Sequence, residues 1–253
     1  MVTGANNGIG YYITERLLAK GYRVAGLDLD GGNLATLGER YADRLGYWCC
    51  DVSSDSAVEM AVGGVVGRWG RIDIVVNSAC LALFQPFAER SLETIRREFE
   101  VNYYGYLRLI RAVLPVMRQQ GGGVIHNVSS GVGLTGFPGL VGYTSTKGAI
   151  EALTRTLALE LAADGITVNL FHPPLTKTKS AAPLGIPDEA MADPVKVGHG
   201  FAERIESHKP VVTPDFSTAV AVYLFRRYPE GLGRLLAKLT ARARGEARAA
   251  MKD

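Results

Sequence analysis

The chain has 253 residues, of which 47% are hydrophobic and 21% charged, and it includes 30 glycines and 11 prolines. These proportions are typical of one α/β domain with a full core, and they exclude disordered, collagen-like and disulfide-scaffold proteins. The net charge of +3 is too small to indicate a nucleic-acid-binding protein, so we expect no nucleic-acid partner.

Short β-branched runs alternate with longer helical stretches along the chain. Strands are predicted at Arg23–Leu27, Ile72–Val76, Val124–Val128 and Ile166–Phe171. Helices are predicted at Gly8–Lys20, Asn33–Asp43, Asp55–Trp69, Ser91–Gln119 and Tyr143–Ala163. This alternation predicts an α/β fold in which a parallel sheet carries helices on both faces.

The last part of the chain is less regular. Residues 174–193 are rich in Pro, Ala and Thr and have no clear period, which is typical of a lid over a binding site. After them we expect a helix at Pro194–Ser207, a short apolar run at Lys209–Thr213 and a helix at Asp215–Arg227. We therefore predict a single domain over residues 1–253, with a substrate lid at about 174–193 and a basic, amphipathic tail at about 228–253.

Leucines in this tail recur at offsets of three, four and seven residues, at Leu232, Leu235, Leu236 and Leu239, with basic residues between and after them. Such a helix packs its leucines on the domain or on a partner subunit, or it lies on an anionic membrane surface. The tail leaves both interpretations open, including a peripheral membrane contact.

A glycine-rich loop, Thr3–Gly10, connects the first strand to the first helix. Only two residues of that strand, Met1 and Val2, precede the loop. Its glycines would let the backbone approach a pyrophosphate, whose charge is met by free N–H groups and the helix dipole, although a plain glycine turn has the same pattern.

The next strand ends at Asp28, whose carboxylate either binds the ribose hydroxyls of a dinucleotide or caps a helix. No Arg or Lys lies in the loop or just after Asp28, so NAD(H) is favoured over NADP(H). Asp51, after the third strand, either contacts the adenine or caps the following helix.

Tyr143 and Lys147 open a helix, and their i, i+4 spacing places a phenol and an ammonium on one face. A nearby positive charge favours the phenolate and would lower the pKa of Tyr143 from its usual value of about 10, which suits an acid or base near neutral pH. The same pair also occurs on solvated helix faces. Ser129 and Ser130 follow the strand Val124–Val128, at the carboxyl end of the sheet where such folds bind ligands.

From Thr3 to about Thr178 the sequence resembles the short-chain dehydrogenase/reductase family. The motifs that carry the resemblance are Thr3-Gly-x-x-x-Gly-Ile-Gly10, Asp51-Val52, Asn77-Ser-Ala79, Asn102, Ser130 and Tyr143-x-x-x-Lys147. The resemblance implies a Rossmann-like, doubly wound parallel sheet with strand order 3-2-1-4-5-6-7 and a nicotinamide cofactor. It also implies a homodimer or homotetramer built on the helices Ser91–Gln119 and Tyr143–Ala163.

The resemblance further implies a role for each motif residue. Tyr143 would exchange a proton with the substrate oxygen, Lys147 would lower the pKa of Tyr143 and bind the nicotinamide ribose, Ser130 would hydrogen-bond the carbonyl, and Asn102 would hold a water in a proton relay. Ser129 would be a structural neighbour. The cofactor-binding residues would be Gly4, Asn7, Gly8, Ile9, Gly10, Asp28, Asp51, Val52, Asn77, Ala79, Tyr143, Lys147, Pro173, Thr176 and Thr178. Hydride would pass directly between substrate and nicotinamide, so we expect no metal.

The sequence departs from the family pattern at four places. Only Met1 and Val2 precede the glycine loop, whereas the family's first strand is usually several residues longer. Cys80 replaces the glycine that follows Asn-Asn-Ala, and Pro174 replaces the glycine of Pro-Gly after the sixth strand. The usual glycine-rich C-terminal strand is absent, and Lys209–Thr213 stands in its place.

The predicted function is the reversible, NAD-dependent oxidation of a secondary alcohol by Tyr, Lys, Ser and Asn. The basic tail, the apolar lid and the segment Leu81–Phe87 favour a small, lipophilic substrate. One alternative is a nicotinamide-sensing or scaffold protein that has lost turnover, and another is an NADPH-dependent ketoreductase of carrier-bound acyl substrates.

Cys49, Cys50 and Cys80 match no disulfide or metal-ligand spacing, so we interpret them as core thiols in a reducing compartment. The sequence has no apolar run of about 18 residues and no signal-peptide pattern. We therefore expect a cytoplasmic protein.

Overall fold

A parallel sheet of seven strands forms the centre of the computed structural model, which describes residues 1–250 and, after residue 241, the backbone alone. The strands are β1 (Val2–Thr3), β2 (Val24–Asp28), β3 (Leu45–Cys49), β4 (Ile74–Asn77), β5 (Gly123–Val128), β6 (Ile166–Phe171) and β7 (Val211–Val212). Their order, β3-β2-β1-β4-β5-β6-β7, confirms the predicted topology. Every pair is parallel, and the longest register is that of β5 with β6, from Gly123 opposite Ile166 to Val128 opposite Phe171.

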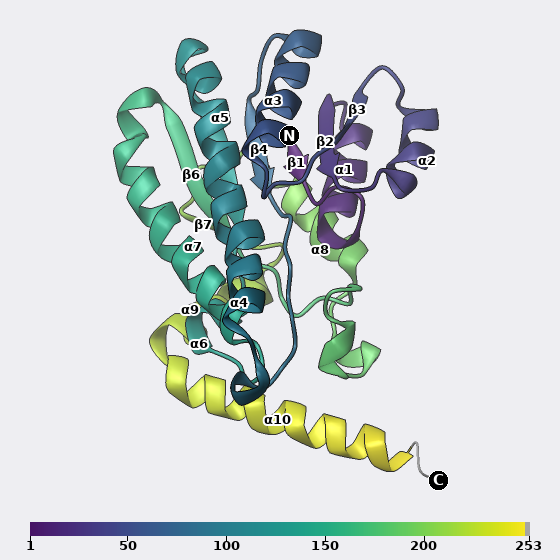
Figure 1. The fold of residues 1–253 in the computed structure, drawn as a ribbon, viewed down its shortest axis with the longest axis vertical. Coiled ribbons are helices and arrows are strands. Elements are labelled where there is room, and N and C mark those ends of the chain that lie inside the picture. The colour runs from purple at the N-terminus through teal and green to yellow at the C-terminus, as the bar shows by residue number, and fades with distance from the viewer. Residues whose placement is uncertain (251–253) are drawn as a thin grey trace.

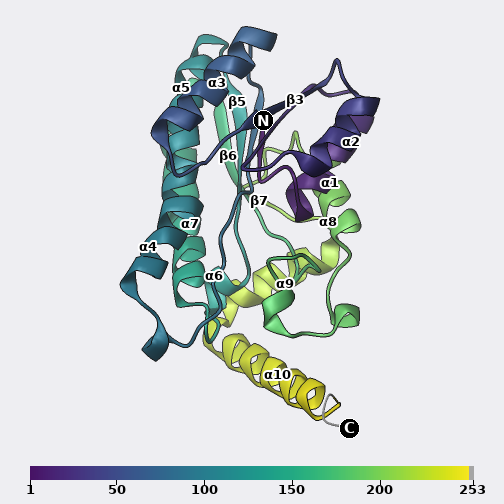
Figure 2. The same cartoon turned by 45° about the vertical axis from the view of Figure 1, so that its right-hand side comes forward.

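Two layers of helices cover the sheet (Figures 1 and 2). One layer contains α1 (Gly8–Ala19), α2 (Gly32–Arg40) and α8 (Pro194–Ala202), and the other contains α3 (Asp55–Trp69), α5 (Gly105–Gln119) and α7 (Val141–Glu160). Each layer has its own core: Ile13, Leu18 and Phe201 pack on one face of the sheet, and Val62, Leu109 and Ile125 pack on the other. Central strands that are buried on both faces account for the nearly continuous apolar runs in the sequence.

The predicted helix Ser91–Gln119 is divided in three. Ser91 caps α4 (Leu92–Phe99) by accepting a hydrogen bond from the Thr94 N–H. A π-helical turn, η2 (Glu100–Tyr104), separates α4 from α5 and contains the buried Asn102. Such turns change the direction of the side chains that follow and are frequent at functional sites.

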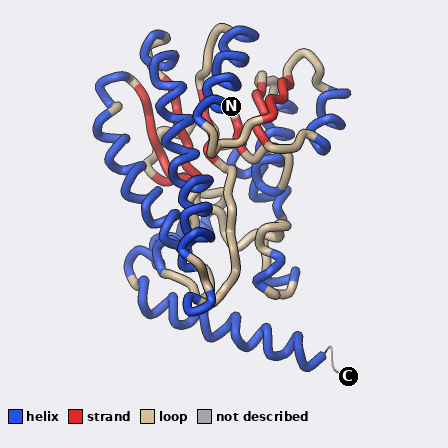
Figure 3. Tube along the Cα trace, viewed as in Figure 1, coloured by secondary structure: helices blue, strands red, loops and turns tan. Residues whose placement is uncertain are grey.

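Short helices and loops lie at the carboxyl edge of the sheet. They include α6 (Val132–Thr135), α9 (Phe216–Arg227), α10 (Pro229–Ala250) and the single turns η1 (Phe87–Glu89), η4 (Ala182–Leu184) and η5 (Asp188–Ala190), whereas the turn η3 (Ala162–Asp164) lies at the opposite edge, directly before β6. Figure 3 shows the longest loops between the sheet and α10. Asp215 caps α9 by accepting from the Thr218 N–H, as the aspartate before an apolar run suggests.

The C-terminal tail forms one helix whose leucines divide between two environments. Leu232 and Leu236 are half-buried, whereas Leu235 and Leu239 are exposed. Residues 251–253 of the predicted tail lie outside the described residues. Among the described residues, none of the helices combines the length and the apolar character needed to cross a membrane.

Several boundary and burial predictions are corrected. The helix expected at Pro194–Ser207 ends at Ala202, and the run Lys209–Thr213 contributes a strand, β7, beside β6. Of the three cysteines only Cys50 is buried, while Cys49 and Cys80 are exposed. Cys49 is at the last position of β3, an edge strand, where a side chain reaches solvent.

Candidate active site

The glycine-rich loop between β1 and α1 has no room for side chains at two of its glycines. A Cβ on Gly10 would lie 2.3 Å from the Gly4 carbonyl oxygen, and a Cβ on Gly4 would lie 2.9 Å from the Ala79 Cα. Gly4 also has a φ of +65° and Gly8 a φ of +55°, which side-chain-bearing residues rarely adopt. The loop therefore exposes backbone N–H groups at the start of α1, where an anionic group is favoured.

Asp28 ends β2 beside this loop. Its Oδ2 accepts from the Asn6 N–H at 2.9 Å, and its Oδ1 accepts from the Leu29 N–H at 2.8 Å. It does not cap a helix, because the residue that serves α2 is Asn6, whose Oδ1 accepts from the N–H groups of Asn33 and Leu34. The helix-cap interpretation of Asp28 is therefore wrong.

Asp51 follows β3 at the same edge of the sheet. Its carboxylate accepts from the Ser53 N–H at 2.8 Å and from the Ser53 hydroxyl at 2.7 Å. The cap of α3 is Ser54, which accepts from the Ala57 N–H. Asp51 thus faces a cavity and does not cap the helix after it.

A cavity of about 720 Å³ runs along the carboxyl edge of the sheet, within the range of ligand sites. It brings together all but two of the predicted site residues: Gly4, Asn7, Gly8, Ile9, Gly10, Asp28, Asp51, Val52, Ala79, Ser130, Tyr143, Lys147, Pro173, Thr176 and Thr178. The glycine loop and the two carboxylates suit a dinucleotide, with free N–H groups for phosphates and acceptors for hydroxyl groups. The residues present therefore fit a nicotinamide cofactor.

Tyr143, Lys147 and Ser130 meet at one part of this cavity. Lys147 is almost fully buried, and its Nζ lies 5.6 Å from the centre of the Tyr143 ring. Its ammonium donates to the Val128 carbonyl oxygen at 2.7 Å and to the Tyr106 hydroxyl at 3.2 Å. The Ser130 hydroxyl forms a hydrogen bond with the Tyr143 phenol.

The acidity of Tyr143 differs from the expectation. Burial raises the pKa of Tyr143 well above its usual value, Cys80 and Glu98 raise it further, and the hydrogen bond with Ser130 opposes the rise. Burial also lowers the pKa of Lys147. In the chain alone, burial outweighs any lowering of the pKa of Tyr143 by Lys147, because removal of the phenolate from water dominates. The lowering expected from Lys147 together with a bound nicotinamide stays a prediction.

Asn77 and Asn102 are not among the residues that line the cavity. The Asn77 amide donates to Asn127 Oδ1 at 2.8 Å. Asn102 accepts from the Leu81 N–H at 2.7 Å and donates both to the Leu81 carbonyl at 2.8 Å and to the Thr146 hydroxyl at 3.1 Å. Both side chains thus link elements that carry the cavity walls.

The two adjacent serines have different surroundings. Ser129 is fully buried, and its hydroxyl donates to Glu151 Oε1 at 2.6 Å. The same carboxylate lies 2.6 Å from His172 Nε2 and 3.1 Å from the Arg226 guanidinium. Burial alone would raise the pKa of Glu151, but His172, Ser129 and Arg226 together lower it.

Sequence reasoning did not identify this buried cluster of Ser129, Glu151 and His172, which the more exposed Arg226 joins from α9. Its one local signal is that Glu151 stands four residues after Lys147, which puts it on the helix face that carries Tyr143 and Lys147. The cluster joins the ends of β5 and β6 to α9, so it positions the strand ends that carry Ser130 and Pro173.

The other part of the cavity wall is apolar. It comprises Ala82, Phe84, Phe137, Leu140, Leu175, Leu184, Ile186, Ala221, Val222, Phe225 and Leu236. Cys80 and Pro174, the two departures from the family pattern near the cofactor, also line it. Within the described part of the chain, no group of three or more His, Cys, Asp or Glu side chains is arranged to hold a metal ion.

Comparisons with known proteins agree with this geometry. A family model described as short chain dehydrogenase matches residues 1–187. Carbonyl reductase (NADPH) 2 of Sus scrofa is 37% identical over 179 residues, which cover 70% of this chain and 71% of that protein. 2-(R)-Hydroxypropyl-CoM dehydrogenase of Xanthobacter autotrophicus is 36% identical over 185 residues, covering 70% and 74%. A solved short-chain dehydrogenase from Streptomyces avermitilis has a TM-score of 0.79 at 27% identity, covering 100% of this chain and 97% of that one.

Proposed function

The chain belongs to the short-chain dehydrogenase family of oxidoreductases, and on that premise we propose that it interconverts a lipophilic secondary alcohol and its ketone with NAD(H). One observation carries the proposal. Ser130, Tyr143 and Lys147 line the same cavity as the glycine loop with its two carboxylates, which suit a dinucleotide, and as the apolar wall. A bound nicotinamide supplies the hydride donor or acceptor.

Proton transfer is the task of Tyr143. Because burial raises its pKa, the phenol is protonated at neutral pH and can donate its proton to a ketone oxygen in the reduction direction. In the oxidation direction the phenolate oxygen accepts the proton of the alcohol, and the ammonium of Lys147 stabilises that anion. Ser130 hydrogen-bonds the substrate oxygen in both directions. Asn102 supports the second turn of α7 through Thr146 and remains our candidate for the proton relay.

Asp28 supports the choice of NAD(H) over NADP(H). Its carboxylate, fixed by the N–H groups of Asn6 and Leu29, can accept hydrogen bonds from ribose hydroxyls and would repel a 2′-phosphate. The name of the Sus scrofa relative specifies NADPH, so both cofactors belong in the test.

The apolar wall supports a lipophilic substrate. Phe84 and Phe137, Leu184 of the segment 174–193, and Phe225 of α9 enclose the end of the cavity beyond Tyr143. Burial of apolar surface contributes about 25 cal/mol per Å², so each methylene added to a substrate tightens binding until the space is filled. We propose that the segment 174–193 acts as the lid of this pocket.

The experiment follows nicotinamide absorbance with a series of secondary alcohols from short and polar to long and apolar, using NAD and NADP separately. We expect turnover with NAD that rises with chain length and that Tyr143→Phe reduces about 100-fold or more. Tyr223→Phe, which changes an exposed tyrosine of α9, serves as the control. No turnover of any alcohol, together with measurable NADH binding, would refute the proposal and favour the nicotinamide-sensing alternative.

We also propose that the protein is a cytoplasmic homodimer or homotetramer. Leu159 on α7 is 82% exposed and Tyr104 beside α5 is 45% exposed, which supports an interface on these two helices. Light scattering after gel filtration distinguishes a monomer from either assembly. A vesicle flotation assay with anionic lipid tests the alternative in which the tail binds a membrane surface.

A further inference from the structure

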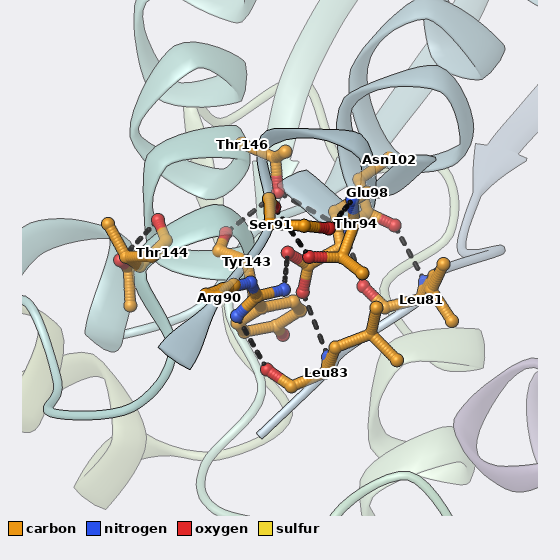
Figure 4. A network of polar contacts seen from close by, with 11 residues as sticks. Leu81, Leu83, Arg90, Ser91, Thr94, Glu98, Asn102, Tyr143, Thr144 and Thr146 are labelled. Atoms are coloured by element: carbon orange, nitrogen blue, oxygen red, sulfur yellow. Dashed lines mark hydrogen bonds and ion pairs between the residues drawn. The ribbon is translucent and has the colours of Figure 1, made fainter. Parts of the chain in front are cut away.

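Two polar side chains, Glu98 and Asn102, connect α7, the helix that carries Tyr143 and Lys147, to the segment 81–84 on the cavity wall (Figure 4). Glu98 lies in α4, and Asn102 lies four residues later in the π-helical turn η2. Asn102 bridges Leu81 and Thr146, and Glu98 bridges Leu83 and Tyr143. The segment 81–84, which contributes Ala82 and Phe84 to the cavity wall, is thus tied to the first turn of α7.

Glu98 acts as the helix cap of α7 from outside that helix. The residue at the cap position is Leu140, which offers no side-chain acceptor. The first N–H groups of a helix need acceptors, and a carboxylate at that end also interacts favourably with the helix dipole. Glu98 accepts from the N–H of Tyr143 and, at 2.9 Å, from the N–H of Leu83.

Arg90 completes the contact. Its guanidinium forms an ion pair with Glu98, and both side chains are fully buried. It also donates to the Leu83 carbonyl oxygen at 2.8 Å, so Leu83 is held through both its N–H and its C=O. A Cβ on Gly142 would lie 1.8 Å from Glu98 Oε2, so the approach of this pair requires glycine before Tyr143.

A buried ion pair is an expensive way to stabilise a fold, because desolvation offsets most of the attraction. Burial raises the pKa of Glu98 even though Leu83 and Arg90 oppose that rise, and the Arg90 Nε is buried without a partner. An apolar contact would join these elements at lower cost. What the pair supplies and an apolar contact does not is directional contact with the backbone of Tyr143.

We propose that Glu98 and Arg90 are a positioning pair for the proposed reaction, holding Tyr143 in register with the substrate wall 81–84 and keeping a charge-compensated carboxylate beside the phenol. The inference rests on the proposed function of Tyr143. Glu98 and Arg90 do not line the cavity, so they act through Tyr143 and not on the substrate.

The pair has an electrostatic signature that a purely structural contact lacks. The charged or titratable groups that face Tyr143 come from the elements around it: Lys147 on its own helix, Cys80 after β4, Tyr106 on α5, and Glu98 on α4 with its partner Arg90. The neutral hydroxyl of Ser130, after β5, hydrogen-bonds the phenol. The negative charge of Glu98 raises the pKa of Tyr143, and the positive charge of Arg90 compensates it. Removal of the Glu98 charge should therefore lower the pKa of Tyr143, and removal of the Arg90 charge should raise it.

The first experiment measures the pH dependence of kcat/KM with an alcohol that the enzyme turns over. We expect Glu98→Gln to lower the apparent pKa by about half a unit or more and Arg90→Gln to raise it by a similar amount. The double variant should return it near the wild-type value, with kcat reduced in all three. Glu93 and Arg96 form an exposed pair on the same helix, 3.8 Å apart, so Glu93→Gln and Arg96→Gln are matched controls that leave the profile unchanged. Shifts in the same direction, or none, would overturn the electrostatic part of the inference.

The second experiment needs no turnover. Hydrogen exchange at the Leu83 and Tyr143 amides, which both donate to Glu98, should become roughly tenfold faster in Glu98→Gln and in Arg90→Gln. Exchange at the Leu81 amide, which donates to Asn102, should stay nearer the wild-type rate. Unchanged exchange at Leu83 and Tyr143 would overturn the positioning role. If the wild-type protein turns over no alcohol but the two variants show these faster exchange rates, the proposed function fails and the contact between the elements stands.

Discussion

Burial of His126 makes the stability of the fold depend on pH. His126 lies in the centre of β5, stacked on Phe171, with its Nε2 2.6 Å from the Ile205 carbonyl and its Nδ1 on Asn169 Oδ1. Burial lowers its pKa to about 4, although both oxygen acceptors favour the protonated ring. The unfolded chain takes up a proton near pH 6.5 and the folded protein only near pH 4, so the unfolded state binds more protons between these values. The contribution of neutral, buried His126 to the free energy of unfolding is fully present above pH 6.5. It is lost as the pH falls toward 4, by roughly 3 kcal/mol in total.

Urea unfolding at pH 7.5 and 5.0 measures this loss. We expect the wild-type protein to lose about 2 kcal/mol more over this interval than His126→Gln, whose neutral amide does not titrate. His199→Gln is the control, because His199 is half-exposed on α8, pairs with Glu15 and is not among the groups that shift the pKa of His126. An equal loss in the wild type and in His126→Gln would refute the reasoning and show that the two carbonyl acceptors outweigh burial.

Two further predictions concern the cofactor end and the buried cluster. In Asp28→Ser, removal of the carboxylate should reduce the ratio of kcat/KM for NAD to that for NADP by about tenfold or more, because the 2′-phosphate is no longer repelled; an unchanged ratio would remove Asp28 from cofactor selection. In Glu151→Gln, loss of a buried charge that serves Ser129, His172 and Arg226 should cost about 2 to 3 kcal/mol and lower Tm by about 5 to 10 °C, as calorimetry can measure. Arg155→Gln removes only the 64% exposed partner of the same carboxylate, so its Tm should stay close to that of the wild type.

The cofactor end could be predicted from the sequence because its signals are local. The segment Thr3–Asp28 contains a glycine-rich turn, the start of a helix and a carboxylate at the end of the next strand, one after the other. Each signal depends on the backbone at its own position, and a parallel sheet brings the strand ends together without further information. For the same reason the helix Asp55–Trp69 and the strand Ile166–Phe171 have their predicted bounds.

Helix caps supplied from elsewhere in the chain could not be predicted. Asp28 precedes a helix and has the side chain of a cap, yet Asn6, 27 residues before Asn33, provides the acceptor for α2. Glu98 plays the same part for α7 from another helix. Local capping rules find the residue next to a helix, but the N–H groups accept from whatever side chain the fold brings near.

Buried carboxylates are the second class that pattern reasoning missed. Glu98 and Glu151 look like the solvated face of an amphipathic helix, since charged side chains are rarely buried without a partner. Their partners become visible only in the fold: Arg226 is 75 residues from Glu151, and the Leu83 N–H is 15 residues from Glu98. The nearer partner Arg90 belongs to a loop whose path no periodicity predicts.

These two carboxylates lie at the two ends of the segment that does the proposed chemistry. Glu98 holds the backbone at Tyr143, and Glu151, one turn after Lys147, holds the strand ends that carry Ser130 and Pro173. The phenol, the ammonium and the serine hydroxyl are therefore fixed relative to one another by contacts outside the cavity. Leu184 and Ile186, which line the apolar wall of the cavity, belong instead to the irregular segment 174–193. Substitutions in that segment should therefore change which alcohols bind while leaving the acidity of Tyr143 unaltered, whereas substitutions at Glu98 should shift that acidity.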